Sequence, residues 1–218
     1  MRTTACTGVA AAMLSLLLSA CAPSLMPDRG ENSGVRKAVP TVPVSGYLRD
    51  YSGLKASPLH EGTWYDMSKS LKGYTKVIVE TPVMHEDAYT NEGPDPATTL
   101  ALIEKMRSET VNALGQQLTI VNEPGPRTAV VRSAITKVVR SRSHDLRTRR
   151  IGGASGEIEI VDSRTGVRLF AAVEEDYAAD PYATQALDPY HDAKVTFTHW
   201  SSRLLRAVRD IDTLATRP

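Results

Sequence analysis

Two segments long enough for helices carry apolar residues at helical spacing, and they flank several shorter segments of the length of strands. This order constrains the fold most. Asp95 followed by Pro96 is typical of a helix start, because aspartate caps the first turn and proline there loses no hydrogen bond. Apolar residues then recur at helical spacing: Leu100, Ile103, Met106, Val111, Leu114 and Leu118. A second stripe, within residues 192–214, consists of Phe197, Trp200, Leu204, Val208 and Ile211.

Runs rich in β-branched residues predict strands outside these stripes. They cover residues 74–83, 118–121, 128–140, 157–161 and 167–177. The last two are joined by residues 162–166, where Gly166 can adopt a left-handed turn conformation, so we expect a hairpin. The isoleucines of 157–161 alternate with Glu157 and Glu159. We therefore expect one face of that strand to be exposed to water.

The order strand, helix, several strands, helix predicts an α+β fold, a mainly antiparallel sheet with two helices packed on one face. Trp200 falls on the apolar stripe of the second helix, so we expect it in the core rather than as a platform for a ligand. The roughly 170 residues from Gly46 onward suffice for one ordinary domain and are too few for two. We therefore predict a single domain over residues 46–218.

The first 20 residues have the three parts of an export signal. Arg2 stands beside the start, an apolar stretch covers residues 9–18, and small residues precede Cys21. A membrane-spanning helix needs about 20 apolar residues, and this stretch is interrupted by Ser15 and closed by Pro23. The pattern therefore favours an export signal over a transmembrane helix.

The four residues ending at Cys21, Leu-Ser-Ala-Cys, resemble the lipobox of bacterial lipoproteins. The resemblance implies that residues 1–20 are a lipoprotein signal peptide, that Cys21 carries the lipid, and that the chain contacts a membrane through this lipid. A signal peptide without lipidation is the alternative. Cys6 lies in the part removed, so the mature chain holds one cysteine and no disulfide.

Residues 22–45 contain Pro23, Pro27, Pro40 and Pro43 and show no helical or alternating period. We interpret residues 21–45 as the lipidated cysteine followed by a tether, which could extend to roughly 75 Å. A loop packed on the domain is the alternative. Loss of Arg2 takes the formal charge from +1 to 0, so no overall field favours nucleic acid as a partner.

Three structural motifs resemble a family of Gram-negative lipoproteins catalogued as domain of unknown function 3313. They are residues 47–54, the strand at 74–83 with its Pro-Val ending, and Pro124-Gly125-Pro126 leading into residues 134–136. The resemblance covers nearly the whole mature chain and implies an outer-membrane lipoprotein with no assigned activity. Ala22 after the cysteine is similar to the outer-membrane sorting pattern, and anchoring in the inner membrane is the alternative.

Signatures of catalysis are weak in this sequence. Residues 153–156, Gly-Ala-Ser-Gly, lack the spacing of a nucleophile elbow, and neither a phosphate-binding glycine loop nor an HExxH motif is present. His85, Glu86 and Asp87 follow a predicted strand and could supply a base and carboxylates, but neighbours on a strand point to opposite faces. We predict no catalytic residue, metal site or cofactor. A periplasmic hydrolase using His85 and a carboxylate such as Asp87 is the alternative.

Two charged clusters remain. Residues 174–176, Glu-Glu-Asp, could bind a divalent cation, but we interpret them as a strand end whose charge keeps a sheet edge soluble. Arginines crowd the connection after residue 140, and guanidinium groups bind phosphates and carboxylates. The candidates for an anionic lipid headgroup or glycan are Arg142, Arg147, Arg149 and Arg150, with a solvated hairpin tip as the alternative.

The function class that fits these observations is a non-catalytic lipoprotein of the bacterial envelope. Its domain would face the periplasm and act as a binding or structural component. An envelope protein or a glycan is the expected partner. Aromatic residues that would stack nucleic-acid bases are missing among the arginines.

Overall fold

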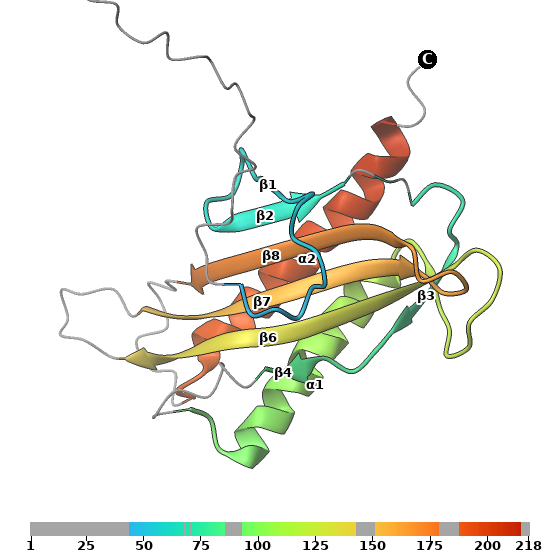
Figure 1. Cartoon of the computed structure of the whole chain (residues 1–218). Coiled ribbons are helices and arrows are strands. Elements are labelled where there is room, and N and C mark those ends of the chain that lie inside the picture. The colour runs from blue at the N-terminus through green and yellow to red at the C-terminus, as the bar shows by residue number, and fades with distance from the viewer. Residues whose placement is uncertain are drawn as a thin grey trace, which may run out of the picture. The chain divides into compact units, whose positions relative to one another are not determined.

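The computed structural model describes residues 44–67, 69, 71–85, 93–142, 151–178 and 188–214. Its elements follow one another in the order shown in Figure 1: β1 (Lys55–Ala56), β2 (Thr63–Asp66), β3 (Lys76–Val79), β4 (Val83–Met84), α1 (Pro96–Leu114), β5 (Thr119–Ile120), β6 (Thr128–Arg142), β7 (Ile151–Asp162), β8 (Arg168–Ala178) and α2 (His191–Leu214). The predicted α+β class is confirmed.

The eight described strands form one sheet in the order β1-β2-β8-β7-β6-β3-β5, with β4 also paired to β6. The pairs from β1 to β6 along this order are antiparallel, whereas β3, β4 and β5 join in parallel. The sheet is therefore mostly antiparallel, and its long centre is made by β6, β7 and β8.

Helix α1 begins where its sequence predicts. The side chain of Asp95 accepts hydrogen bonds from Thr98 N at 3.0 Å and from Thr98 Oγ1 at 2.6 Å. The expected stripe is wrong at Leu100, whose side chain is 68% exposed, whereas Leu102 is fully buried. Two positions along a helix turn the side chain by about 200°, so only one of these leucines can face the core.

Helix α2 buries the predicted stripe as far as it is described. Trp200 is 7% exposed, and its ring centre lies 5.5 Å from that of Phe197. Both side chains share one apolar cluster with α1 residues, including Met106, and with Ile135 of β6. Both helices lie behind the sheet in Figure 1. Neither described helix is long and apolar enough to cross a membrane.

The predicted hairpin between β7 and β8 is confirmed. Asp162 accepts hydrogen bonds from the backbone of Arg164 and Thr165, and Gly166 supplies the left-handed position with φ of 67°. The hydrogen bond from Thr165 N, assisted by the Thr165 hydroxyl and Tyr74, lowers the pKa of Asp162 to about 2. A local turn signal in the sequence thus has a direct structural counterpart.

Other strand boundaries differ from expectation. The single strand predicted over 74–83 is divided into β3 and β4, because Pro82 has no N–H to donate to the ladder. β7 begins at Ile151 and includes the small residues that precede Glu157. β1 and β2 were not predicted, since they are short and lack a long apolar alternation.

The sheet face opposite the helices is covered by residues 44–54, which we call the N-terminal strap (Figure 1). Leu48 and Leu54 of the strap are buried against Trp64, Ala171 and Val173. We expected the face of β7 that carries Glu157 and Glu159 to be exposed to water, and this expectation is wrong at Glu157. Glu157 is only 1% exposed. The strap removes this face from water and supplies the hydrogen bonds that the carboxylate needs.

Candidate binding pocket

A pocket of about 140 Å³ lies between strands β2 and β8 and the second half of helix α2. Phe170, Ala172 and Glu174 occupy alternate positions of β8, so they point to the same side of the sheet. Helix α2 contributes residues at helical spacing, and the loop after β1 completes the wall. The other lining residues are Ser57, Leu59, His60, Thr63, Tyr65, Met67, Arg203, Leu204, Arg206 and Ala207.

The pocket has an apolar end and a polar end. Phe170, Ala172 and Leu204 are buried and form an apolar floor with Met67. Glu174 pairs with Thr63 across the strands, which places both residues at the other end. Because successive residues of a strand advance by about 3.3 Å, the two ends of the floor are roughly 13 Å apart.

An ion pair fixes the polar end. Arg203 Nε donates to Glu174 Oε2 at 2.7 Å, and its Nη2 lies 3.2 Å from Asp176 Oδ2. Glu174 is 7% exposed. Burial raises the pKa of Glu174 to about 7, although the charge of Arg203 acts in the opposite direction. The carboxylate therefore changes protonation near neutral pH.

Two basic residues border the mouth. Arg206 is exposed, and none of the residues whose side chains the structure describes forms an ion pair with it. Partial burial, followed by the charges of Arg203 and Arg206, lowers the pKa of His60. Leu59 stands on the same loop with 81% of its surface exposed. The mouth thus combines the guanidinium group of Arg206 with apolar surface.

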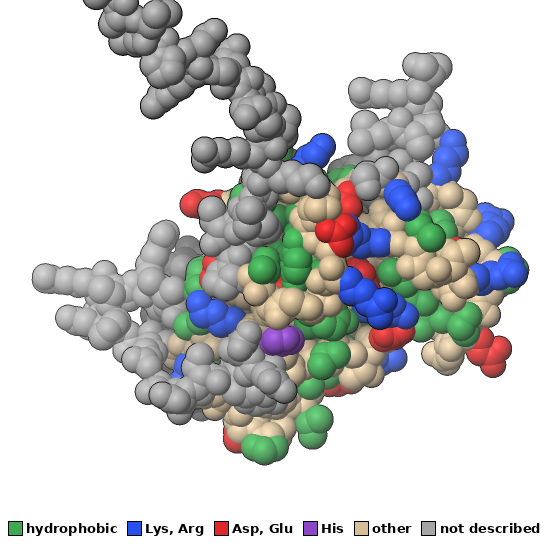
Figure 2. Space-filling model, in the orientation of Figure 1, with side chains coloured by type: hydrophobic (Ala, Val, Ile, Leu, Met, Phe, Trp, Pro, Cys, Tyr) green, Lys and Arg blue, Asp and Glu red, His purple; other side chains and the backbone are tan. Residues whose placement is uncertain are grey.

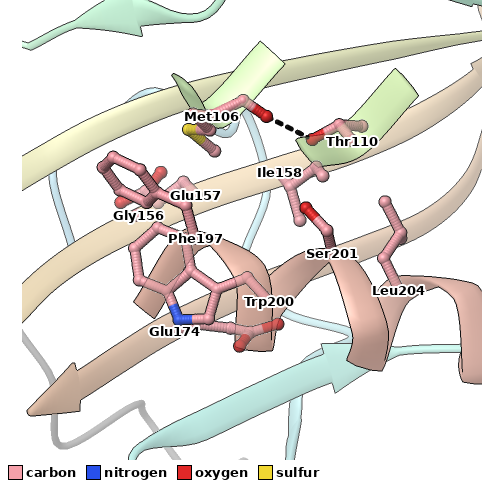
Figure 3. Close-up of a pocket in the computed structure, with 10 residues that line it drawn as sticks. All are labelled: Met106, Thr110, Gly156, Glu157, Ile158, Glu174, Phe197, Trp200, Ser201 and Leu204. Atoms are coloured by element: carbon pink, nitrogen blue, oxygen red, sulfur yellow. Dashed lines mark hydrogen bonds between the residues drawn. The ribbon is translucent and has the colours of Figure 1, made fainter. Parts of the chain in front are cut away.

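A smaller cavity of about 20 Å³ adjoins the pocket and shares Glu174 and Leu204 with it. In Figure 3 the Trp200 indole and the Glu174 carboxyl group lie at the same end of this cavity. The indole Nε1 is buried and has no hydrogen-bond partner among the described residues. The volume suits about one water molecule, which could accept from Trp200 and contact Glu174.

The strap face carries a wider groove of about 480 Å³. Figure 2 shows Lys and Arg side chains beside Asp and Glu side chains on this face. Arg168 lies 3.3 Å from Asp66, and Arg132 lies 3.4 Å from Glu80. Because these opposite charges already pair with each other, the groove is a weaker candidate for a charged ligand than the pocket.

The structure changes the interpretation of residues 174–176. Glu174 pairs with Thr63 of β2 on one side and with Gly156 of β7 on the other, so it does not lie at a soluble sheet edge. Glu174 and Asp176 instead point toward α2 and bind Arg203. Their spacing of two residues was the available signal, but nothing near them in the sequence identifies Arg203 as the partner.

Most other predicted site residues fall outside the described residues. This applies to Cys21, Asp87, Arg147, Arg149 and Arg150, and to the side chain of Arg142. His85 follows β4, and its backbone N–H donates to the carbonyl oxygen of Ile135 at 2.9 Å. Within the described parts of the chain, no group of His, Cys, Asp and Glu is arranged to hold a metal ion.

Comparison with known proteins places this fold in context. The family model described as "Protein of unknown function (DUF3313)" matches residues 43–204, which include most of the pocket. No curated protein matches the chain.

Solved structures give weaker likenesses. The PelC dodecamer from Paraburkholderia phytofirmans is 15% identical, covering 64% of this chain and 96% of that chain, with a TM-score of 0.42. Lipoprotein GNA1162 from Neisseria meningitidis is 14% identical over 66% and 99% of the two chains, with a TM-score of 0.33. A minor lipoprotein from Acinetobacter baumannii is 11% identical over 63% and 92%, with a TM-score of 0.36. These likenesses are too small to carry an inference about function.

Proposed function

The chain belongs to the family described as "Protein of unknown function (DUF3313)", and on that premise we propose a non-catalytic binding protein of the bacterial envelope. Its anchor is a lipid on Cys21, inserted in the outer membrane, and its domain faces the periplasm. The lipobox-like sequence before Cys21 supports the anchor. The domain's binding site is the pocket between β2, β8 and α2.

The observation that carries this proposal is the two-ended pocket. A buried apolar floor next to a few fixed polar groups is the usual construction of a small-molecule site. The Glu174–Arg203 pair orients the polar end. Both groups are engaged with each other, so this geometry favours recognition of a ligand over activation of a nucleophile.

A test of the site uses the full chain extracted from its native membrane in mild detergent. We expect native mass spectrometry to find a small molecule that remains bound to the protein. Ala207→Phe should fill the apolar end from the helix side and remove that molecule, whereas Arg209→Phe on the same helix should retain it. The same bound mass in both variants would place the ligand elsewhere and overturn the proposed site.

A test of the anchor uses intact mass. We expect the mature chain to begin at Cys21 and to carry a diacylglycerol and an amide-linked acyl chain, because one chain alone anchors a protein only marginally. Cys21→Ser should abolish this mass and release the protein or leave the precursor uncleaved. A wild-type chain that is unmodified and begins elsewhere would contradict the anchor.

The arginines at 142, 147, 149 and 150 form a second proposed contact, with an anionic headgroup or glycan. Their density of charge supports it. Replacing Arg147, Arg149 and Arg150 by Ser should weaken salt-sensitive binding to anionic vesicles and leave the melting temperature nearly unchanged. Equal vesicle binding would rule it out.

A further inference from the structure

We propose that the pocket binds a small aliphatic carboxylate, with the carboxylate held at the mouth beside Arg206 and His60 and the alkyl chain on the apolar floor. This inference rests on the proposed function, because it names the ligand class for the same pocket. Three features carry it: the size of the pocket, its floor and the charges at its mouth.

The size and floor favour a short alkyl chain. A volume of about 140 Å³ is close to that of an engineered cavity of about 150 Å³ that holds benzene, so it suits a chain of about six carbon atoms. Phe170 and Leu204 are each 4% exposed, and Ala172 is 1% exposed. An alkyl group has no polar atoms, so burying it against these side chains leaves no hydrogen bond unmade.

The charges favour an anionic head over a cationic one. Arg203 is already bound to Glu174 and Asp176, so the cation with no ion-pair partner among the described residues is Arg206. The charges of Arg203 and Arg206 both lower the pKa of His60, although burial contributes more and the charge of Asp176 acts in the opposite direction. An ammonium head placed at the mouth would be repelled by Arg206, since the charge of Arg203 is offset by Glu174 and Asp176.

Glu174 is the group that opposes an anion in this pocket. Burial raises the pKa of Glu174 to about 7, so it repels a bound carboxylate less than an exposed glutamate would. Asp176 faces the same arginine, and its charge is paired with Arg203 at 3.2 Å. The other polar residues that the sheet contributes, Thr63 and Tyr65, carry hydroxyl groups that can donate hydrogen bonds.

The experiment compares three probes with the same chain and different heads: hexanoate, hexylamine and hexanol. The full lipidated chain is placed in nanodiscs of zwitterionic lipid, and binding is followed by saturation-transfer NMR against empty nanodiscs. Hexanoate should bind at least about tenfold more tightly than hexylamine, and added salt should weaken it.

Two substitutions on α2 locate the head and the chain. Arg206→Ser should lower the affinity for hexanoate about threefold, as expected for an exposed ion pair. Arg209→Ser is the matched control, because Arg209 lies one helical turn further on and does not line the pocket. Ala207→Phe should abolish binding of hexanoate. Unchanged melting temperatures would show that each variant is folded.

The outcomes separate the ligand class from the proposed function. If hexylamine or hexanol binds as tightly as hexanoate and Ala207→Phe abolishes all three, the carboxylate class is wrong and the pocket remains a binding site. If hexanoate binds both Ala207→Phe and Arg206→Ser as tightly as the wild type, the pocket is not its site and the inference is wrong. If no probe binds and native mass spectrometry finds no bound molecule, the proposed function fails as well.

Discussion

Two buried glutamates on neighbouring strands, Glu157 of β7 and Glu174 of β8, face opposite sides of the same sheet. Glu157 accepts hydrogen bonds from Ser45 N at 2.6 Å, Leu48 N at 3.1 Å and the Tyr51 hydroxyl at 2.6 Å. Glu174 instead faces the arginine of α2. The first carboxylate fixes a chain segment through neutral donors, whereas the second is balanced by a charge inside a pocket.

This difference assigns different roles to the two faces. The donors on Glu157 come from the strap, which leads directly to the residues that connect the domain to the proposed anchor. Losing that carboxylate should weaken the attachment of the strap, which the packing of Leu48 and Leu54 also stabilises. Glu174 joins β8 to α2 and makes no hydrogen bond with the strap, so a change there should alter the pocket and leave the strap bound. The predictions that follow test this separation.

The largest effect should come from Trp200, which packs over Gly156 on the helix side. A Cβ at Gly156 would lie 2.6 Å from the Trp200 ring, so the contact is already close. We expect Trp200→Ala to destabilise the fold by about 3 to 5 kcal/mol by leaving a cavity. Chemical denaturation measures this. A loss of unfolding free energy below about 1 kcal/mol would place Trp200 outside the core. In a second experiment, limited proteolysis should leave the strap protected in Trp200→Ala but cleave it in Trp64→Ala.

The next effect concerns pH and Glu174. Its pKa is about 7 in the fold against an ordinary value of 4.5, so the folded state holds the proton more tightly. Stability should therefore fall as pH rises from about 4.5 to 7, by up to about 3 kcal/mol, and change no further from this group above that range. Denaturant melts across this window should show the slope in the wild type and lose it in Glu174→Gln. The same slope in both proteins would assign the pH dependence to other groups.

Local signals predicted the parts of the fold whose partners are close in sequence. The cap at Asp95, the stripe around Trp200 and the turn at Gly166 each depend on residues within one or two turns. Glu157 was misjudged because alternation assumes that one face is wet, and the strap that covers it lies more than 100 positions earlier. The pocket was not predictable for the same reason, since Arg203 lies 29 positions from Glu174.

A smaller effect is expected at Glu157. In Glu157→Gln one acceptor oxygen remains, but the amide group presents its own hydrogens to donors in the strap. We expect a loss of about 2 kcal/mol in unfolding free energy, with faster hydrogen exchange at Ser45 and Leu48. Glu159→Gln is the control, because Glu159 is only partly buried and lies 3.8 Å from Arg132. An equal loss in both variants would show that the strap does not depend on Glu157.

The smallest effect should come from Tyr51, which joins the strap to Glu157 by its hydroxyl group. Burial, and then the hydrogen bond to Glu157, raise the pKa of Tyr51 to about 12, so the hydroxyl stays a donor at neutral pH. It also accepts from Gly46 N at 2.9 Å. Tyr51→Phe removes both bonds and retains the ring, so we expect a loss of about 1 kcal/mol and faster exchange at Gly46. Tyr177→Phe, with an exposed hydroxyl on the same face, should change stability by less than about 0.5 kcal/mol. If hexanoate binding is also unchanged in Tyr51→Phe, the strap and the pocket act independently, as the opposite directions of Glu157 and Glu174 predict.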